Sequence, residues 1–221
     1  MSENLIKILM DSFWKIVLPG LTLTIPLTAI SFAIALVIAV AVALIQTANI
    51  PVAKQLCRFY VWVVRGTPLL VQLFVIFYGL PRLGVMLNPI PAAILVFSIN
   101  TGAYDSETMR AAIASVSKGQ LEAGLCVGMR YAQVMRRIIL PQAFRTAFPP
   151  LSNSLMSLLK DTSLAANITV AEMFMATQRI VARTYEPLAL YIEVALVYLL
   201  FSTVLTWLQN AGEKRLRRYG G

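Results

Sequence analysis

Long apolar stretches divided by short polar segments set the pattern of this chain. No residue from 16 to 53 is charged, whereas a membrane-spanning helix needs only about 20 predominantly apolar residues. Further apolar stretches follow, each bounded by charged or proline-containing segments. The pattern predicts an all-α, polytopic membrane protein with about five transmembrane helices. The expected spans are residues 21–44, 68–80, 89–114, 147–166 and 188–208.

The composition supports a membrane protein. Of the 221 residues, 58% are hydrophobic and 13% are charged, whereas soluble domains average about 25% charged residues. We expect a single transmembrane domain over 1–221, with its core at about 18–210 and no separate soluble enzyme domain. There is no histidine, and neither Cys57 nor Cys126 belongs to a metal-binding pattern. We therefore expect no metal site, no catalytic residue and no bound cofactor.

The basic residues predict the orientation in the membrane. Short loops rich in lysine and arginine stay in the cytoplasm. With five spans, the three most basic segments all fall on one side, so we expect the N-terminus outside and the C-terminus inside. This distribution also favours a membrane over nucleic acid as the reason for the net charge of +9. These residues are Lys54 and Arg58, then Lys118, Arg130, Arg136, Arg137 and Arg145, and finally Lys214, Arg215, Arg217 and Arg218.

One of these basic segments, LEAGLCVGMRYAQVMRRIILPQAF (residues 121–144), is built from good helix formers. Its apolar residues form no single clean face, and its arginines spread around the predicted helix. Two interpretations are open from the residues alone. The segment is either a basic amphipathic helix resting on anionic lipid or a helix that docks onto another protein.

The spacing within the segment favours protein docking. Glu122-Ala123-Gly124 is followed after three residues by Gly128, and after nine more by Ile138, one residue and Leu140-Pro141. This resembles the EAA loop of ABC importer permeases, whose pattern is EAA, x3, G, x9, I-x-L-P. Gly124 departs from it, because alanine is usual there. The resemblance implies an ATPase-coupling interface in a cytoplasmic loop at about 117–145. Its residues would be Glu122, Ala123, Gly124, Gly128, Ile138, Leu140 and Pro141.

Other segments extend the resemblance to permeases of polar amino acids. RGTPLLVQL (65–73), NTGAY (100–104) with Glu107, and KDTSL (160–164) are similar to segments of that family. YGLP (78–81), PIP (89–91) and ETMRAAI (107–113) look most like its cystine-type members. The resemblance implies the transmembrane subunit of a type I ABC importer in a bacterial inner membrane. Its substrate would be cystine or another polar amino acid.

The same resemblance implies partners. The chain would pair with a second copy of itself or with a paralogue. An ATPase dimer would bind ATP and Mg and seat the coupling helix, and an extracytoplasmic binding protein would deliver the amino acid. The sequence agrees in one respect, since it has no GxxxxGK[ST] loop for nucleotide phosphates. We therefore expect a non-catalytic subunit whose ATP hydrolysis takes place on a partner chain.

Ionisable residues inside spans are costly and usually functional. Asp105, Glu107, Lys160 and Asp161 are therefore the candidates for the substrate path. Other interpretations stay open: Glu107 and Arg110 share a helix face and could form an internal brace. Asp105 could meet a substrate ammonium, and the Lys160-Asp161 pair favours a cavity or gate position over lipid.

The loop residues carry more specific expectations. Glu122 is expected to pair with a basic residue of the ATPase. Gly128 is expected to be an interface glycine rather than a helix terminator. Leu140-Pro141 is expected to stop the helix and turn the chain into the fourth span. Two other functions remain as alternatives: a channel or secondary carrier that works without an ATPase, and a non-transporting scaffold, which the charges inside the spans argue against.

Overall fold

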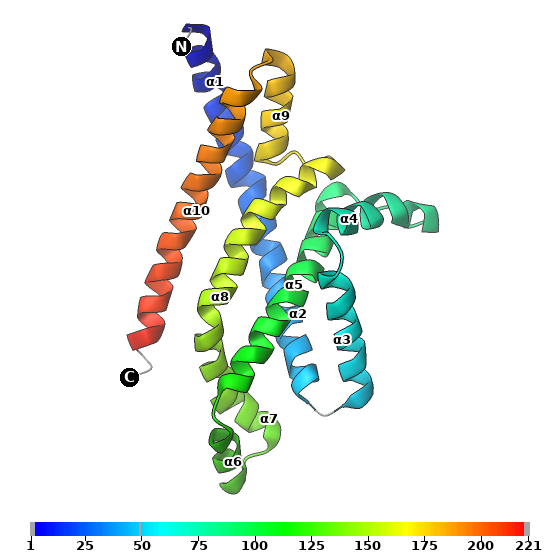
Figure 1. Ribbon diagram of the computed structural model, residues 1–221, viewed down its shortest axis with the longest axis vertical. Helices are drawn as coiled ribbons and strands as arrows, with labels where there is room; N and C mark the ends of the chain where they lie inside the picture. The colour runs from blue at the N-terminus through cyan, green and yellow to red at the C-terminus, as the bar shows by residue number, and fades with distance from the viewer. Residues whose placement is uncertain (1–2, 49, 219–221) are drawn as a thin grey trace.

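The computed structural model describes residues 3–48 and 50–218, and all regular elements in that part of the chain are helices (Figure 1). The expected all-α class is confirmed. The outermost residues of the domain expected over 1–221 lie outside the described residues. In order the elements are α1 Glu3–Pro19, η1 Gly20–Thr24, α2 Ile25–Thr47, α3 Pro51–Arg65, α4 Leu69–Phe74, η2 Val75–Gly79, η3 Leu80–Leu83, α5 Pro89–Ser115, α6 Lys118–Cys126, α7 Tyr131–Val134, η4 Met135–Ile139, α8 Leu140–Asp161, η5 Thr162–Ile168, α9 Met173–Thr184 and α10 Pro187–Arg218.

The first expected span, 21–44, is part of a much longer helix. α1, η1 and α2 form one continuous helix of 45 residues, Glu3–Thr47. At about 1.5 Å per residue it is roughly 68 Å long, about twice the hydrocarbon thickness of a bilayer. The five residues of η1 are π-helical, and Ile25 N–H bonds to the carbonyl of Gly20. This wider turn carries the helix past Pro19 and Pro26, which have no N–H to donate.

The second crossing differs from the expectation. α3 pairs with α2, and the chain then bends by 103° between α3 and the segment Leu69–Leu83. Pro68 has extended backbone angles and is the N-cap of the new helix that begins at Leu69. The proline also disfavours a helical conformation at the residue before it, so α3 cannot readily continue through this point. The residues expected as the second span, 68–80, are helical as part of Leu69–Leu83, but they form only one arm of this bent pair. That arm divides into α4, η2 and η3 and points away from the bundle in Figure 1.

The centre of the molecule is the packing of α5 against α2 and α8. Ala35, Ala39 and Ala43 recur every fourth residue on α2 and are fully buried. Gly102 of α5 packs so closely that a Cβ there would lie 2.9 Å from the Ile38 side chain. Small residues allow two membrane helices to approach in this way. The position of the third span is confirmed, since α5 covers Pro89–Ser115.

Hydropathy alone recognises fewer spans than the fold contains. Among the described residues, two helices are long and apolar enough to cross a membrane by themselves, Glu3–Thr47 and Pro187–Arg215, or up to three if the bent pair counts as one. α5 and α8 have 27 and 22 residues, which is sufficient length, but they carry polar side chains. The fourth span begins at Leu140, earlier than the expected 147–166, and ends at Asp161.

Candidate functional site

A small helical lobe projects from one end of the bundle. This lobe, residues 117–139, contains α6, α7 and η4, and it lies beyond the ends of α5 and α8 at the bottom of Figure 1. It holds most of the residues that the EAA-like spacing singled out. The structure brings Glu122, Ala123, Gly124 and Gly128 together here, on or just after α6.

Gly128 ends α6. Its φ is +82°, a left-handed conformation that glycine adopts without a steric penalty. Met129 N–H bonds to the Gly124 carbonyl at 3.1 Å and Gly128 N–H bonds to the Leu125 carbonyl at 3.0 Å, which together form a Schellman motif. Gly128 is therefore a helix terminator, which was not expected from the sequence, whereas its place at an interface with another chain stays a prediction. The space around Gly128 is open, with no described atom within 4 Å of where a Cβ would lie.

Gly124 has a different task. It is buried against α7, and a Cβ at this position would lie 2.7 Å from a methyl group of Val134. Real Cβ contacts are not that short, so alanine would require α6 and α7 to separate or Val134 to move. The departure from the usual alanine therefore has a packing cause inside the lobe. Val134 and Met135 in turn join the lobe to the core cluster around Ala143 and Met109.

The outer surface of the lobe mixes polar and apolar side chains. Glu122 and Ala123 are exposed, and Val127 is 77% exposed, with Leu125 and Tyr131 nearby in sequence also exposed. Exposed apolar residues rimmed by polar ones are typical of a protein-binding surface. This surface is separate from the packed inner side of the lobe.

Ile138, Leu140 and Pro141 do not stop the helix. α7, η4 and α8 follow one another without a break from Tyr131 to Asp161, so the expected turn at Leu140-Pro141 is wrong. The π-helical bond from Leu140 N–H to the Met135 carbonyl lets the helix continue past the proline. Ile138 and Leu140 pack against the core. They anchor the lobe to the fourth span and do not form its outer surface.

α5 carries polar groups along the bundle. The Arg110 guanidinium donates from Nε and Nη2 to one oxygen of Glu107, at 3.1 and 2.9 Å. The Arg65 guanidinium lies 5.2 Å from the centre of the Tyr104 ring, within the range of a cation–π contact. The Glu107–Arg110 pair is thus present as expected from the spacing. It stays partly open to the surroundings, with Arg110 exposed.

Asp105 is hidden inside the bundle. It is 2% exposed, it lies beside Ser154 of α8, and its Oδ2 has no hydrogen-bond partner among the described residues. A substrate cannot reach it in this arrangement. Burying an acidic side chain without a partner costs free energy. The contact of Asp105 on α5 with Ser154 on α8 therefore depends on how closely these two helices pack.

Lys160 lies in a cleft. The cleft has a volume of about 730 Å³ and separates the end of α8 from α10. Asp161 follows in sequence and is half-buried. The cleft provides a cation, hydroxyl groups and aromatic rings, which together suit a small zwitterionic molecule. Its polar and aromatic lining is Lys160, Ser163, Phe174, Tyr191, Tyr198 and Ser202.

The contribution of the last helix to this cleft was missed by the sequence analysis. Tyr191 and Tyr198 lie in an apolar span that gave no sign of a site. Glu172, which is fully buried, was not among the candidate residues. Its carboxylate accepts N–H bonds from Phe174 and Met175 at 2.8 Å and an O–H bond from Tyr198 at 3.1 Å. An acid just before a helix is the signal that could have indicated this N-cap.

A family profile decides the class of the protein. The profile described as "Binding-protein-dependent transport system inner membrane component" matches residues 51–218. The chain belongs to this family. The match spans the bent pair, the lobe, the cleft and the last helix, and the fold is that of a permease subunit in a membrane.

Named relatives of the permease transport amino acids. It is 48% identical over 210 residues to the L-cystine transport system permease protein of Bacillus subtilis (strain 168), covering 95% of this chain and 90% of that one. It is 33% identical to the glutamine transport system permease protein of Escherichia coli (strain K12), covering 91% and 93%.

Solved structures share the fold. A crystal structure of an amino acid ABC transporter has a TM-score of 0.87 and 31% identity, and the match covers 97% of this permease and 100% of that chain. An inward-facing methionine ABC transporter matches with a TM-score of 0.72 at 15% identity, covering 98% and 99%. At that identity the second match concerns the fold alone.

Proposed function

We propose that this permease is the transmembrane subunit of an ATP-driven importer that moves cystine or another polar amino acid into the cytoplasm. The observation that carries the proposal is the unbroken helix from Tyr131 to Asp161. One end of it forms part of the exposed lobe, and the other end lies next to the cleft of Lys160. A force applied to the lobe is therefore transmitted directly to the residues beside the cleft.

The lobe is the proposed docking site for a separate ATPase dimer. Glu122, Ala123 and Val127 form its exposed surface, while Gly124, Ile138 and Leu140 hold it to the bundle. ATP and Mg bind to the ATPase, and this chain supplies no catalytic group. In this assembly the lobe and the C-terminus lie in the cytoplasm and the N-terminus lies outside. A second permease, either a copy or a paralogue, completes the path, and an extracytoplasmic binding protein delivers the amino acid.

The substrate path is proposed to begin at the cleft. The Lys160 ammonium is the group that would meet the carboxylate of an amino acid, with the hydroxyls of Tyr198 and Ser202 on the facing helix. Asp161 borders the same end of α8. Asp105 and Glu107 lie on α5 and do not line this cleft. Asp105 becomes available to a substrate only if α5 and α8 separate.

Affinity purification from native membranes tests the proposal. The wild-type permease is expected to retain an ATP-binding subunit. Val127→Asp, which places a charge in the exposed centre of the lobe, is expected to weaken this association roughly tenfold or more, because a charge buried without a partner is costly. Met86→Asp is the matched control, since Met86 is 85% exposed but belongs to the connection before α5 at the other end of that helix.

Uptake of labelled cystine in cells without the ATPase completes the test. Uptake should stop, because the motor is a separate chain. If uptake persisted, and if the permease purified alone in every mild detergent, the protein would be a channel or a secondary carrier, and the lobe would need another explanation.

A further inference from the structure

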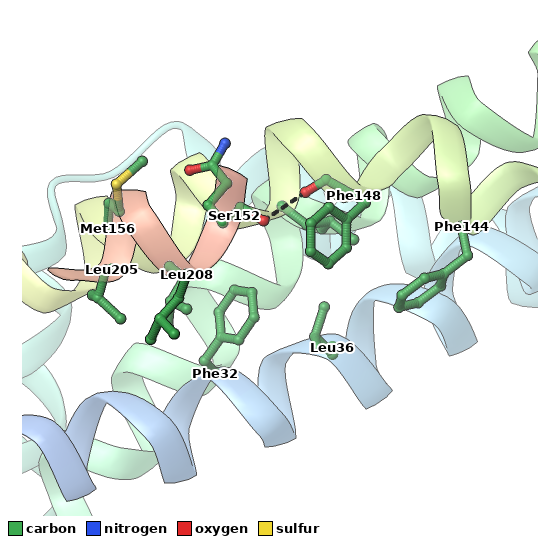
Figure 2. Close-up of a pocket in the computed structure, with 11 residues that line it drawn as sticks. Phe32, Leu36, Phe144, Phe148, Ser152, Met156, Leu205 and Leu208 are labelled. Carbon is green, nitrogen blue, oxygen red and sulfur yellow. Dashed lines mark hydrogen bonds between the residues drawn. The ribbon is translucent and has the colours of Figure 1, made fainter. Parts of the chain in front are cut away.

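An apolar groove runs between α10 and the pair α2 and α8. It consists of two adjoining cavities of about 260 and 640 Å³. Figure 2 shows the smaller cavity, with Phe32 and Leu36 from α2 facing Phe148 and Phe144 from α8. The residues common to both cavities are Phe32, Leu36, Leu155, Leu205 and Leu208.

The few polar groups in the groove are nearly all satisfied within the helices. Ser152 donates to the Phe148 carbonyl at 2.8 Å, and Thr28 donates to the Thr24 carbonyl at 2.8 Å. Gln209 donates from its Nε2 to Glu213 at 3.0 Å, whereas its Oε1 is buried and has no partner among the described residues. The walls of the groove are therefore almost entirely hydrocarbon.

Two glycines fix the ends of the groove. Near one end, α10 touches the first helix where Phe201 packs on Gly20, so closely that a Cβ on Gly20 would lie 2.6 Å from the ring. Near the other end, α10 touches α8 where Gly212 meets Phe148, with a corresponding distance of 2.7 Å. Between these two contacts α10 does not fill the space to α2. The groove therefore results from the position of α10, which the two glycine contacts fix, and not from a small side chain in its walls.

The dimensions fit a lipid chain. From Phe144 to Leu159, both of which line the groove, the rise along α8 is roughly 22 Å at 1.5 Å per residue. One leaflet of a bilayer provides hydrocarbon over about half of a 30 Å core. An acyl chain of one leaflet therefore fits within the groove along its length.

The end of the groove near Gly212 is basic. Arg145 directly follows Phe144 on α8, and Lys214 and Arg215 lie just beyond Gly212 on α10. All three are exposed. The acid at this end of α10, Glu213, already accepts the bond from Gln209. Because α8 and α10 run in opposite directions, these cations gather at the end of the groove nearest the lobe. That end is complementary to a lipid phosphate.

From these observations we infer that the groove binds an anionic phospholipid, with one acyl chain between α2, α8 and α10 and its phosphate at Arg145 and Arg215. The lipid fills the space between the two glycine contacts. It is a structural lipid of the permease, apart from the proposed path of the amino acid.

Native mass spectrometry tests the inference. The permease, with the subunits that purify with it, is taken from vesicles of equal parts phosphatidylglycerol and phosphatidylcholine. The wild type should retain phosphatidylglycerol in preference. Ala33→Phe, which fills the groove from α2, should abolish the bound lipid. Val37→Phe is the matched control, because Val37 is 70% exposed and lies one turn further along α2, outside the groove.

A second variant separates the headgroup from the chain. Arg145→Gln with Arg215→Gln should reduce the preference for phosphatidylglycerol by roughly 25-fold, since each basic residue near a membrane surface contributes about fivefold. Equal retention of lipid by Ala33→Phe and the wild type would overturn the inference. So would a disulfide between two permeases through Ala33→Cys, made with Cys57→Ser and Cys126→Ser, because a second copy would then occupy the groove.

Discussion

At the scale of single residues, two glycines four positions apart serve opposite needs. Gly124 is required because there is no space beside it, and Gly128 is required because its backbone is left-handed although the space beside it is open. Sequence spacing recognised both positions but could not distinguish their reasons. A positive φ and a 2.7 Å approach depend on where α7 lies, and that position is determined by the core under the lobe.

Substitutions at Gly128 should depend on the backbone and not on size. Gly128→Ala is expected to destabilise the lobe by about 1 kcal/mol, and Gly128→Asn by less, because asparagine tolerates the left-handed region better. Thermal unfolding of the purified complex and retention of its ATP-binding subunit measure the effect. If Asn and Ala behaved alike, strain at φ +82° would not be the cause.

Substitution at Gly124 should depend on its neighbour. Gly124→Ala restores the usual EAA pattern but is expected to cost about 1–3 kcal/mol through overpacking. Val134→Ala in the same chain should recover most of that loss, because it removes the two methyl groups that the new Cβ would meet. A double-mutant cycle on unfolding measures the coupling. Additive effects would contradict the contact.

Lys160 should determine substrate affinity. Lys160→Met is expected to raise the KM of uptake roughly 30-fold, the equivalent of about 2 kcal/mol for a lost charged hydrogen bond. Lys160→Arg should keep much of the affinity. Both variants should still retain the ATPase, because the cleft and the lobe lie at opposite ends of α8. Unchanged uptake by Lys160→Met would show that the cleft is not on the path.

At the scale of elements, the helices differ from those predicted from the sequence mainly at prolines. Pro141 does not end its helix, because a π-helical turn precedes it, whereas Pro68 starts a helix at a 103° bend. From the sequence, a proline indicates only that one backbone N–H donor is missing. Whether the chain turns or widens its helix depends on the packing around it. The predicted spans 89–114 and 188–208 agree with α5 and α10, because the prolines of these helices lie in their first turns, where no N–H bond is lost.

The joint η4 should be necessary for transmission. Arg136→Gly with Arg137→Gly is expected to soften the helix between the lobe and α8, at about 1 kcal/mol per glycine relative to alanine. The ATPase should still bind, but its hydrolysis should no longer drive uptake. Arg136→Ala with Arg137→Ala is the control, since it removes the same charges and keeps the helix. Normal uptake by the glycine variant would mean that stiffness at η4 is not required.

At the scale of the whole molecule, the basic segments predict which end of the permease faces the cytoplasm. Chemical labelling tests it. Cys126 in the lobe is exposed and should react with a membrane-impermeant maleimide only after cells are opened. Met86→Cys, before α5, should react in intact cells. The reverse result would invert the proposed topology and remove the ATPase from the lobe.

The length of the first helix has a consequence for the opposite end of the molecule. A helix of roughly 68 Å still reaches about 52 Å along the membrane normal at a tilt of 40°, so it extends well beyond the hydrocarbon layer. α9 and the start of α10 pack beside its first part, through Ile16, Met173 and Val194, and Ser12 is bonded to Glu193. At the end opposite the lobe, the first helix, α9 and the start of α10 therefore form a packed helical structure that projects from the membrane. A soluble protein that approaches from this side would contact this structure before it contacts lipid.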